Sequence, residues 1–245
     1  MDKPKRTRID KLLVDHGYFE SRERAQRSIL AGQVLVEERV IDKPGTLVKS
    51  DAPVRVIAEE KYVGRGGYKL EAALDHFAIN ATDLVCLDVG ASTGGFTDCL
   101  LQRGAQRVIA VDVGHNQVAW KIRCDPRVEV LEGLNARVLS PELIRTTVQL
   151  AVVDVSFISL TLVLPPILRC VEEGGSVVAL IKPQFELERN QVGKGGIVRE
   201  QEYRLRAVSK IRSFATEQLH REWRGVIESP ILGAKGNREF LACLR

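Results

Sequence analysis

Short apolar runs of strand length recur through most of the chain and limit the folds that it can adopt. Between residues 84 and 245 they read LVCLDVG, RVIAVDVG, VEVLEG, QLAVVDVSF, SVVALIKP and REFLACLR. Helical stretches or turns separate most of them, and continuous apolar strands that alternate with helices are typical of a mostly parallel sheet with helices on both faces. The pattern predicts a doubly wound α/β domain.

The first apolar run ends in a glycine-rich loop. Residues 87–98 read LDVGASTGGFTD, and a helix is expected after the loop. Ligands of doubly wound sheets bind beyond the carboxyl ends of the strands, where glycines let backbone N–H groups approach them closely. Asp112 ends the second run, where a carboxylate can accept hydrogen bonds from ribose hydroxyls. This order indicates a nucleotide-type ligand; a tight turn that serves only packing is the alternative.

The sequence of the loop differs from two common nucleotide-binding motifs. It is not the G-x-G-x-x-G fingerprint of dinucleotide-binding domains, and it lacks the Lys-Ser/Thr of a P-loop. A second glycine cluster, GKGG at residues 193–196, also lacks the spacing and the preceding strand of a P-loop. The cofactor is therefore expected to be of another kind.

The first 60 residues have a different pattern. Ile9, Leu12 and Leu13 recur at helical spacing, and Gly17 is placed to end that helix. A second helix is expected from an N-cap at Ser21 to a left-handed residue at Gly32. Beyond it the apolar period changes to two, which predicts short strands around residues 34–36 and 54–56. These elements predict a compact α+β unit.

Positive charge is concentrated in the first 70 residues. The net charge is +4, and residues 1–70 contain 15 Lys and Arg against 11 Asp and Glu, so they hold all of the excess. A basic unit joined to a neutral one favours an anionic partner that the first unit holds and the second modifies. A solvated surface that is basic by chance is the alternative. The charged and then glycine-rich stretch EEKYVGRGG suggests domains at residues 1–59 and 68–245 with a linker at 60–67.

Other features argue against several classes of protein. The best candidate for a membrane span, residues 160–171, is short and contains Pro165 and Pro166. No apolar segment follows the charged amino terminus, so nothing suggests secretion. The five cysteines are scattered, without C-x-x-C spacing or paired histidines, which argues against a disulfide framework and against a metal site. A cytoplasmic protein with reduced thiols is expected.

The first unit resembles the S4 RNA-binding domain. The shared run is TRIDKLLVDHGYFESRERAQRSILAGQVLVEERVIDKPGTLV, which keeps the order and spacing of that family's motifs. The two helices of the family dock on structured RNA, where neutralised phosphates release counterions. The resemblance thus implies phosphate contacts from five cations, each of which has simple solvent exposure as its alternative: Arg8, Lys11, Arg22, Arg24 and Arg27.

The second domain resembles FtsJ-like RNA 2′-O-methyltransferases, which have the Rossmann-like class I methyltransferase fold. The match rests on LDVGASTGGFTDCLL, and together with YKL, VDVSFISL, IKPQFE and GNREFL the whole chain is similar to the TlyA family, some of whose members carry a hemolysin label. The resemblance implies S-adenosylmethionine as cofactor and ribosomal RNA or a ribosomal subunit as substrate, with no protein partner implied. It assigns the cofactor to Gly90, Ser92, Gly94, Phe96, Asp112 and Asn135.

Four ionisable residues match the catalytic tetrad of that family: Lys69, Asp154, Lys182 and Glu239. Three of them lie at the ends of expected strands, so they can converge on one cleft. A ribose hydroxyl must lose its proton as it attacks a methyl group in line, and a lysine accepts that proton only when it is neutral. A second cationic lysine favours the neutral form by repulsion. We therefore expect Lys182 to be the base and Lys69 its neighbour, with the two carboxylates orienting the ammonium groups.

Two further features near these residues have open alternatives. Phe157, shortly after Asp154, is expected either to stack on the target base or to pack in the core. The polar segment 186–200 is either a lid over the site or a plain connection. For the whole chain, the alternatives to an rRNA 2′-O-methyltransferase are a non-catalytic RNA-binding assembly factor and, with least support, a membrane-lysing protein.

Overall fold

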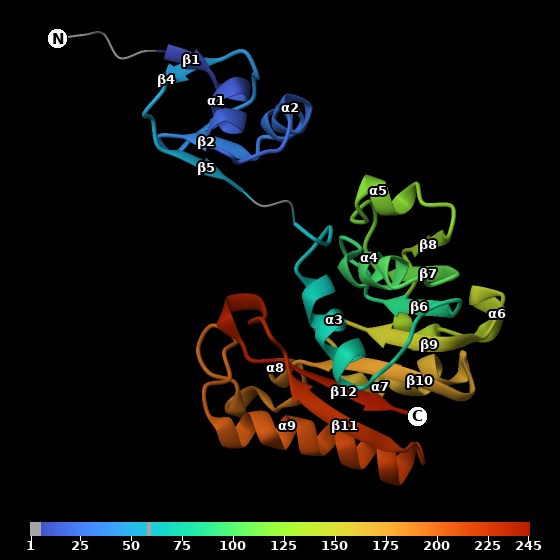
Figure 1. The fold of residues 1–245 in the computed structure, drawn as a ribbon. Helices are drawn as coiled ribbons and strands as arrows, with labels where there is room; N and C mark the ends of the chain where they lie inside the picture. The colour runs from blue at the N-terminus through green and yellow to red at the C-terminus, as the bar shows by residue number, and fades with distance from the viewer. Residues whose placement is uncertain (1–5, 58–59) are drawn as a thin grey trace. The chain divides into compact units, whose positions relative to one another are not determined.

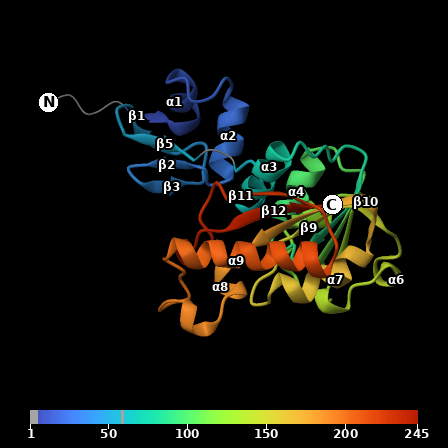
Figure 2. The same ribbon diagram turned by 90° about the horizontal axis from the view of Figure 1, so that it is seen from below.

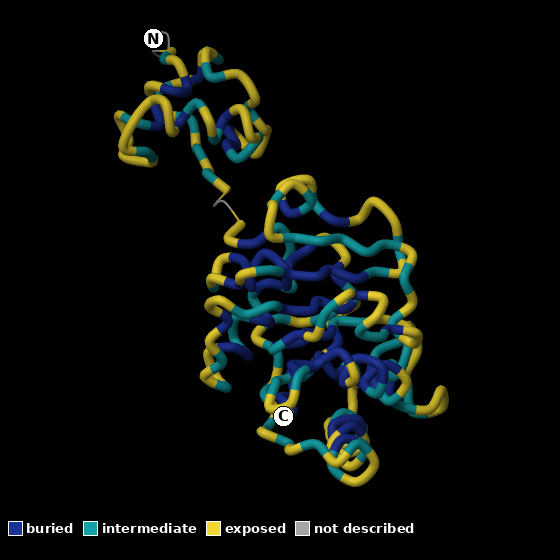
Figure 3. Tube along the Cα trace, turned by 90° about the vertical axis from the view of Figure 1, so that its right-hand side faces the viewer, coloured by how far each residue is buried: buried dark blue, intermediate teal, exposed yellow. Residues whose placement is uncertain are grey.

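The computed structural model describes residues 6–57 and 60–245. The chain divides into two compact units, Met1–Glu60 and Lys61–Arg245. Each unit encloses a hydrophobic core of its own, as the runs of buried residues in Figure 3 show.

The first unit packs two short helices against small antiparallel sheets. α1 (Ile9–Asp15) and α2 (Arg22–Leu30) bury Ile9, Leu13 and Ile29 against the middle strand of the sheet β3-β2-β5. Ser21 caps α2, its hydroxyl accepting a hydrogen bond from the Arg24 N–H at 3.3 Å, as the sequence predicts. The strands described in this unit are β1 (Arg6–Arg8), β2 (Val34–Val36), β3 (Arg39–Ile41), β4 (Leu47–Lys49) and β5 (Val54–Val56).

A mostly parallel sheet forms the middle of the second unit. Within residues 60–245 its order is β11-β12-β10-β9-β6-β7-β8, and near one edge β12 is antiparallel to both of its neighbours, β10 and β11. This confirms the doubly wound α/β prediction. Its strands are β6 (Val85–Val89), β7 (Arg107–Asp112), β8 (Val128–Glu132), β9 (Val148–Val153), β10 (Val171–Ile181), β11 (Trp223–Glu228) and β12 (Phe240–Leu244).

Helices cover both faces of this sheet (Figure 2). One face packs against α3 (Gly66–His76) and α4 (Gly95–Gln102), and the other against α7 (Leu160–Arg169) and α9 (Gln201–Ser213). The remaining helices are α5 (Trp120–Arg123), α6 (Pro141–Ile144), α8 (Pro183–Glu186), the 3₁₀ turns η1 (Ala136–Val138), η2 (Arg189–Gln191) and η4 (Ala234–Gly236), and the π-turn η3 (Phe214–Gln218).

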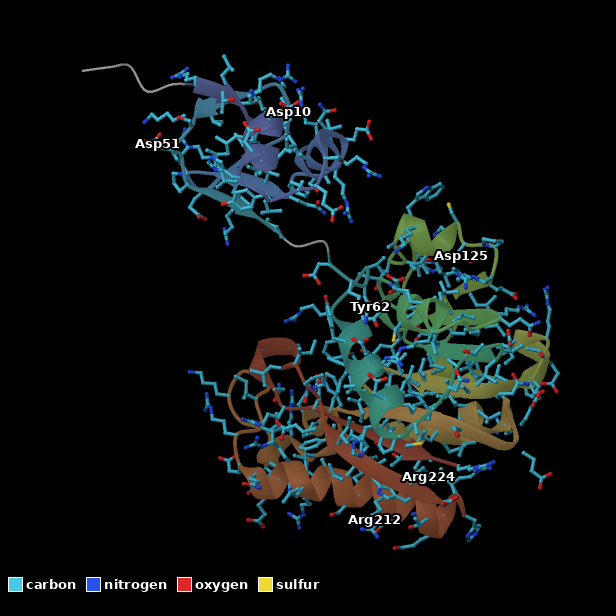
Figure 4. All side chains as sticks on the ribbon, viewed as in Figure 1. Asp10, Asp51, Tyr62, Asp125, Arg212 and Arg224 are labelled. Atoms are coloured by element: carbon cyan, nitrogen blue, oxygen red, sulfur yellow. The ribbon has the colours of Figure 1, made fainter. Side chains whose placement is uncertain are left out.

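Most of the segment expected to be a linker, residues 60–67, belongs to the second unit. Tyr62 is 2% exposed and packs with α3 and α4 (Figure 4), and Gly66 and Gly67 form the first turn of α3. A Cβ atom at Gly67 would lie 2.2 Å from Cγ of Tyr62. The glycine therefore leaves room for the tyrosine ring, which could not pack there against a larger residue.

Two elements differ from the sequence pattern. Pro165 and Pro166 lie inside α7, although proline lacks the N–H that a helix interior uses. The edge strand β11 alternates between half-buried and exposed residues, so its weak apolar signal gives no strand prediction. Among the helices of the described residues, none combines the length and apolar character that crossing a membrane requires.

Candidate active site

The site lies where the chain reverses its direction of winding across the sheet. β6 and β9 are adjacent and parallel, and the next strands extend outward from them on opposite sides. The Asp154 N–H donates to the carbonyl of Val89 at 2.9 Å, which joins the two loops that leave these strands. Such a switch point is where doubly wound sheets bind ligands. A cavity of about 460 Å³ opens there, and its lining includes Gly90, Ser92, Asp112, Asn135, Asp154 and Phe157.

Two glycines shape the glycine-rich loop. Gly90 has φ of 89°, and a Cβ atom there would lie 2.5 Å from the carbonyl oxygen of Asp154. Gly94 also has a left-handed φ, 94°, and begins α4. Glycine suits both conformations. The loop thus delivers the amino-terminal end of α4 to the strand ends.

Asp112 is fixed against this loop. Its carboxylate accepts hydrogen bonds from the N–H groups of Ser92 and Gly114, each at 2.7 Å. Asn135 also lines the cavity, and its side-chain oxygen accepts from the N–H of Arg137 at 3.0 Å. The Asp112 carboxylate is fixed by two backbone N–H groups and still lines the cavity, so it is suited to accept hydrogen bonds from ribose hydroxyls. The donor set therefore fits a nucleoside-type cofactor.

Two of the residues expected at the cofactor, Gly94 and Phe96, do not line the main cavity. Phe96 is 3% exposed and packs in the core under the loop, although its ring lines a smaller pocket together with Gly66 and Asp154. Gly94 lines neither of these cavities, and a Cβ atom on it would meet Ile122 at 3.2 Å. Gly94 contributes the turn into α4, and Phe96 contributes the floor of the pocket.

The structure brings the four tetrad residues to one edge and one face of the sheet. Lys182 follows β10 and Asp154 follows β9. Because side chains alternate along a strand, both residues fall on the face of the sheet that packs against α3 and α4. Glu239 precedes β12 on the same face, and the pairing of Ile181 with Phe240 sets it beside Lys182. Lys69 comes from α3, which covers this face.

Two ion pairs connect these residues. Lys69 Nζ lies 2.6 Å from Oε2 of Glu239, and both side chains are almost fully buried, with 10% and 2% exposed. Lys182 Nζ lies 2.6 Å from Oδ1 of Asp154 and donates to the hydroxyl of Ser156 at 2.8 Å. Each buried cation thus has its own carboxylate, which offsets the cost of removing the charges from water. The carboxylates also fix where the two ammonium groups point.

A fifth ionisable group lies under the site. The Asp88 side chain is fully buried at the end of β6, and its Oδ2 accepts from the Thr97 hydroxyl at 2.6 Å. Burial raises the pKa of Asp88 to about 7, and the negative charges of Asp154 and Asp112 add to the shift. Asp88 is therefore protonated over much of the acidic range while the protein is folded.

This shift gives a testable dependence of stability on pH. Because the folded state keeps the Asp88 proton that the unfolded chain loses near pH 4, stability falls as pH rises from about 4 to about 7, by up to about 1.4 kcal/mol per unit. Asp88→Asn cannot ionise, and its amide oxygen can still accept from Thr97. We expect the variant to lose this slope in urea unfolding at pH 5, 6, 7 and 8. Parallel curves for the two proteins would contradict the assignment.

Three contributors to the site have no clear signal in the sequence. Ser156 bonds Lys182, Asp88 is buried under the loop, and Gly233 packs against Glu239. A Cβ atom at Gly233 would lie 1.9 Å from Oε1 of Glu239. Gly233 lies in the segment before the last expected strand, and the sequence pattern does not show which side chain it contacts.

In the first unit, two of the predicted RNA contacts form ion pairs within the protein. Arg8 and Arg22 both bind the buried carboxylate of Asp10, at 2.9 and 2.8 Å (Asp10 is labelled in Figure 4). Their side chains remain 50% and 53% exposed. The arginine pair therefore holds the unit together and presents only part of each guanidinium to solvent.

The other three predicted cations are exposed. Arg24 makes a surface ion pair with Glu20 at 2.9 Å, and together with Arg27 it lines a groove beside Tyr18. Lys11 is exposed on α1. Among the described residues, neither Lys11 nor Arg27 has an ion-pair partner. These two cations are the ones that remain free for an anionic ligand.

Phe157 does not pack in the core. Its side chain is 90% exposed, and its backbone has a left-handed φ of 64°, which is unusual for an aromatic residue. The ring contacts that of Phe185, with centroids 5.1 Å apart. An exposed aromatic ring is thus held at the cavity mouth by a strained backbone.

Comparison with known proteins gives the family. The FtsJ-like methyltransferase family matches residues 62–245, and the S4 domain family matches residues 7–54. The chain is 45% identical to the 16S/23S rRNA (cytidine-2'-O)-methyltransferase TlyA of Mycobacterium tuberculosis, over 98% of this chain and 90% of the relative. It is 44% identical to Hemolysin A of Brachyspira hyodysenteriae, over 96% and 98% of the two chains. A solved structure of a hemolysin-labelled protein from Streptococcus thermophilus matches with a TM-score of 0.74 and 43% identity, over 99% of this chain and 89% of that chain. The chain therefore belongs to the TlyA family of FtsJ-like methyltransferases that carry an S4 domain.

Proposed function

We propose that the protein transfers a methyl group from S-adenosylmethionine to a ribose 2′-hydroxyl of ribosomal RNA in the cytoplasm. The observation that carries the proposal is the pair of lysine–carboxylate contacts, Lys69 with Glu239 and Lys182 with Asp154, of which Asp154 lines the cofactor-type cavity. The cytidine 2′-O-methyltransferase that is 45% identical over nearly the full chain supports the same reaction.

The proposed chemistry divides the work between the cavity and the tetrad. Asp112 and Asn135 would hold the nucleoside part of the cofactor, and the loop at Gly90 and Ser92 its amino-acid part. When bound, the cofactor supplies an electrophilic sulfonium methyl and a positive charge that favours a neutral lysine nearby. Nζ of Lys182 would accept the proton that the ribose 2′-hydroxyl loses when it takes up the methyl group that the cofactor would supply. Asp154 and Ser156 hold Nζ in position for this transfer.

The reaction is tested by methyl transfer to ribosomal subunits. Purified protein with tritium-labelled cofactor is expected to label rRNA, and mass spectrometry of nuclease fragments is expected to place the label on a ribose. Absence of labelling from both subunits, with cofactor binding intact, would favour a non-catalytic assembly factor. Leakage from phospholipid vesicles treated with pure protein would favour the membrane-lysing alternative.

Phe157 is expected to stack on a base beside the reacting ribose. Stacking on an aromatic ring is worth about 1–3 kcal/mol per base, so Phe157→Ala should raise the KM for rRNA about 5- to 100-fold. Steady-state kinetics with ribosomal subunits measure this, and calorimetry should show unchanged cofactor affinity. Phe157→Tyr should restore the KM. Leu162→Ala, which truncates an exposed residue on α7, is the matched control; an equal effect there would contradict the stacking role.

A further inference from the structure

A buried carboxylate on the segment that follows Lys182 has no part in the mechanism above. Glu186 ends α8 and is 4% exposed. Its Oε2 accepts from the hydroxyl of Ser159 at 2.5 Å, and its Oε1 accepts from the N–H of Leu160 at 2.8 Å. Burying a carboxylate costs free energy unless several donors compensate it. Its position is therefore one that the fold specifies strongly.

The donors to Glu186 come from the segment that carries Asp154. Ser159 is the N-cap of α7, where its hydroxyl also accepts from the N–H of Thr161 at 3.2 Å. Residues 154–160 run from Asp154 through Phe157 to this cap. The carboxylate of Glu186 thus connects the segment after β10 to the segment after β9.

The same two segments meet at three places. Lys182 binds Asp154 and Ser156 at one end, and Glu186 binds Ser159 and Leu160 at the other. Between them, the ring of Phe185 contacts that of Phe157. The two hydrogen bonds of Glu186 are the buried end of this connection, whereas Asp154 and Ser156, the partners of Lys182 at the other end, line the cavity.

A single cation approaches Glu186 in the described part of the chain. Lys210 on α9 lies 3.5 Å from Oε2, and its Nζ also donates to the carbonyl of Glu186 at 2.6 Å. Burial raises the pKa of Glu186, while Ser159 and Leu160 oppose the rise through their hydrogen bonds. Lys210 thus adds a positive charge beside the carboxylate, whose two oxygens are held by the hydrogen bonds from Ser159 and Leu160.

We propose that Glu186 is a positioning residue for methyl transfer: it fixes residues 154–160 against residues 182–186 and so sets the placement of Lys182 and Phe157 relative to the cavity. The inference rests on the proposed function, because Lys182 is the group whose placement matters. A displacement of about 1 Å in such a group can lower a rate about 100-fold without loss of binding. Glu186 is buried and does not line the cavity, so it would act through Lys182 and not by contact with cofactor or RNA.

The test separates kcat from KM. Glu186→Ala should lower kcat for rRNA methylation about 10- to 100-fold, per molecule that binds cofactor, with the KM for cofactor changed less than about 3-fold. Glu186→Gln keeps an oxygen for the Leu160 N–H and should restore most of kcat. Glu186→Asp keeps the charge on a shorter side chain, and it should lose activity even if the alanine variant does not fold. Glu200→Ala, at an exposed site before α9, is the matched control and should retain wild-type kcat.

Hydrogen exchange gives a readout that does not need turnover. Amides of residues 154–160 should exchange faster in Glu186→Ala than in wild type, while those of β6 should not change. Wild-type kcat in both the alanine and aspartate variants would overturn the proposal, as would a loss that follows only the unfolded fraction. Failure of the proposed function would show differently, as an inactive wild-type protein in the same assay.

Discussion

Replacing Lys182 is expected to abolish methyl transfer without loss of cofactor binding. Lys182 lies beside the cofactor-type cavity but does not line it, so Lys182→Ala should leave cofactor affinity unchanged. Loss of a general base costs about 10²- to 10⁴-fold in rate. Single-turnover tritium transfer to ribosomal subunits measures the chemical step, and calorimetry measures cofactor binding in the same preparations.

A second substitution distinguishes proton transfer from simple electrostatics. Lys182→Arg keeps a positive charge opposite Asp154, but a guanidinium does not release its proton in a protein. If Lys182 is the base, the arginine variant should be as inactive as the alanine variant. Lys194→Ala removes an exposed lysine and should keep the wild-type single-turnover rate. Substantial transfer by Lys182→Arg would contradict the proton-acceptor role.

The sequence predicts the strand ends well because they depend on only two physical signals, the apolar runs and the parallel pairing of the strands. Apolar runs define β6, β7, β8, β9 and most of β10, and the parallel sheet then places the residues after them at one edge. The loop at residues 90–95 and the acid at Asp112 follow from the same rule, and the structure shows them joined through the Ser92 N–H. Positions fixed by backbone topology are accessible to sequence reasoning.

Contacts between side chains from distant segments are not accessible in this way. From the sequence, Arg8 and Arg22 are exposed cations that are available to RNA. In the structure both guanidinium groups bind the buried carboxylate of Asp10, and only about half of each side chain is exposed. Phe96 is a predicted cofactor contact, and the structure shows that its ring packs in the core under the loop and also lines a smaller pocket. A periodicity argument gives the face of a residue and not its partner, so charge compensation and packing become visible only in the folded chain.

The carboxylate between those arginines should dominate the stability of the first unit. Asp10 has no exposed side-chain surface and accepts from Arg8, from Arg22 and from the Gln26 amide at 2.8 Å. The hydrogen bond from Arg8 holds the pKa of Asp10 well below its usual range, and Arg22 and Gln26 contribute in the same direction against burial. The stabilisation is thus complete at neutral pH and is lost as pH falls through the depressed pKa.

Asp10→Ala should therefore lower the free energy of unfolding of the first unit by about 1.5–3 kcal/mol, because it removes the hydrogen bonds from Arg8, Arg22 and Gln26 while the half-exposed guanidinium groups stay solvated. Hydrogen exchange of peptides from α1, α2 and β2 in the full chain reports this unit separately from the second. Glu20→Ala removes the partner of Arg24 from an exposed pair and should change the same value by less than about 1 kcal/mol. Unchanged protection in Asp10→Ala would show that the packing of Ile9, Leu13 and Ile29 alone maintains the unit.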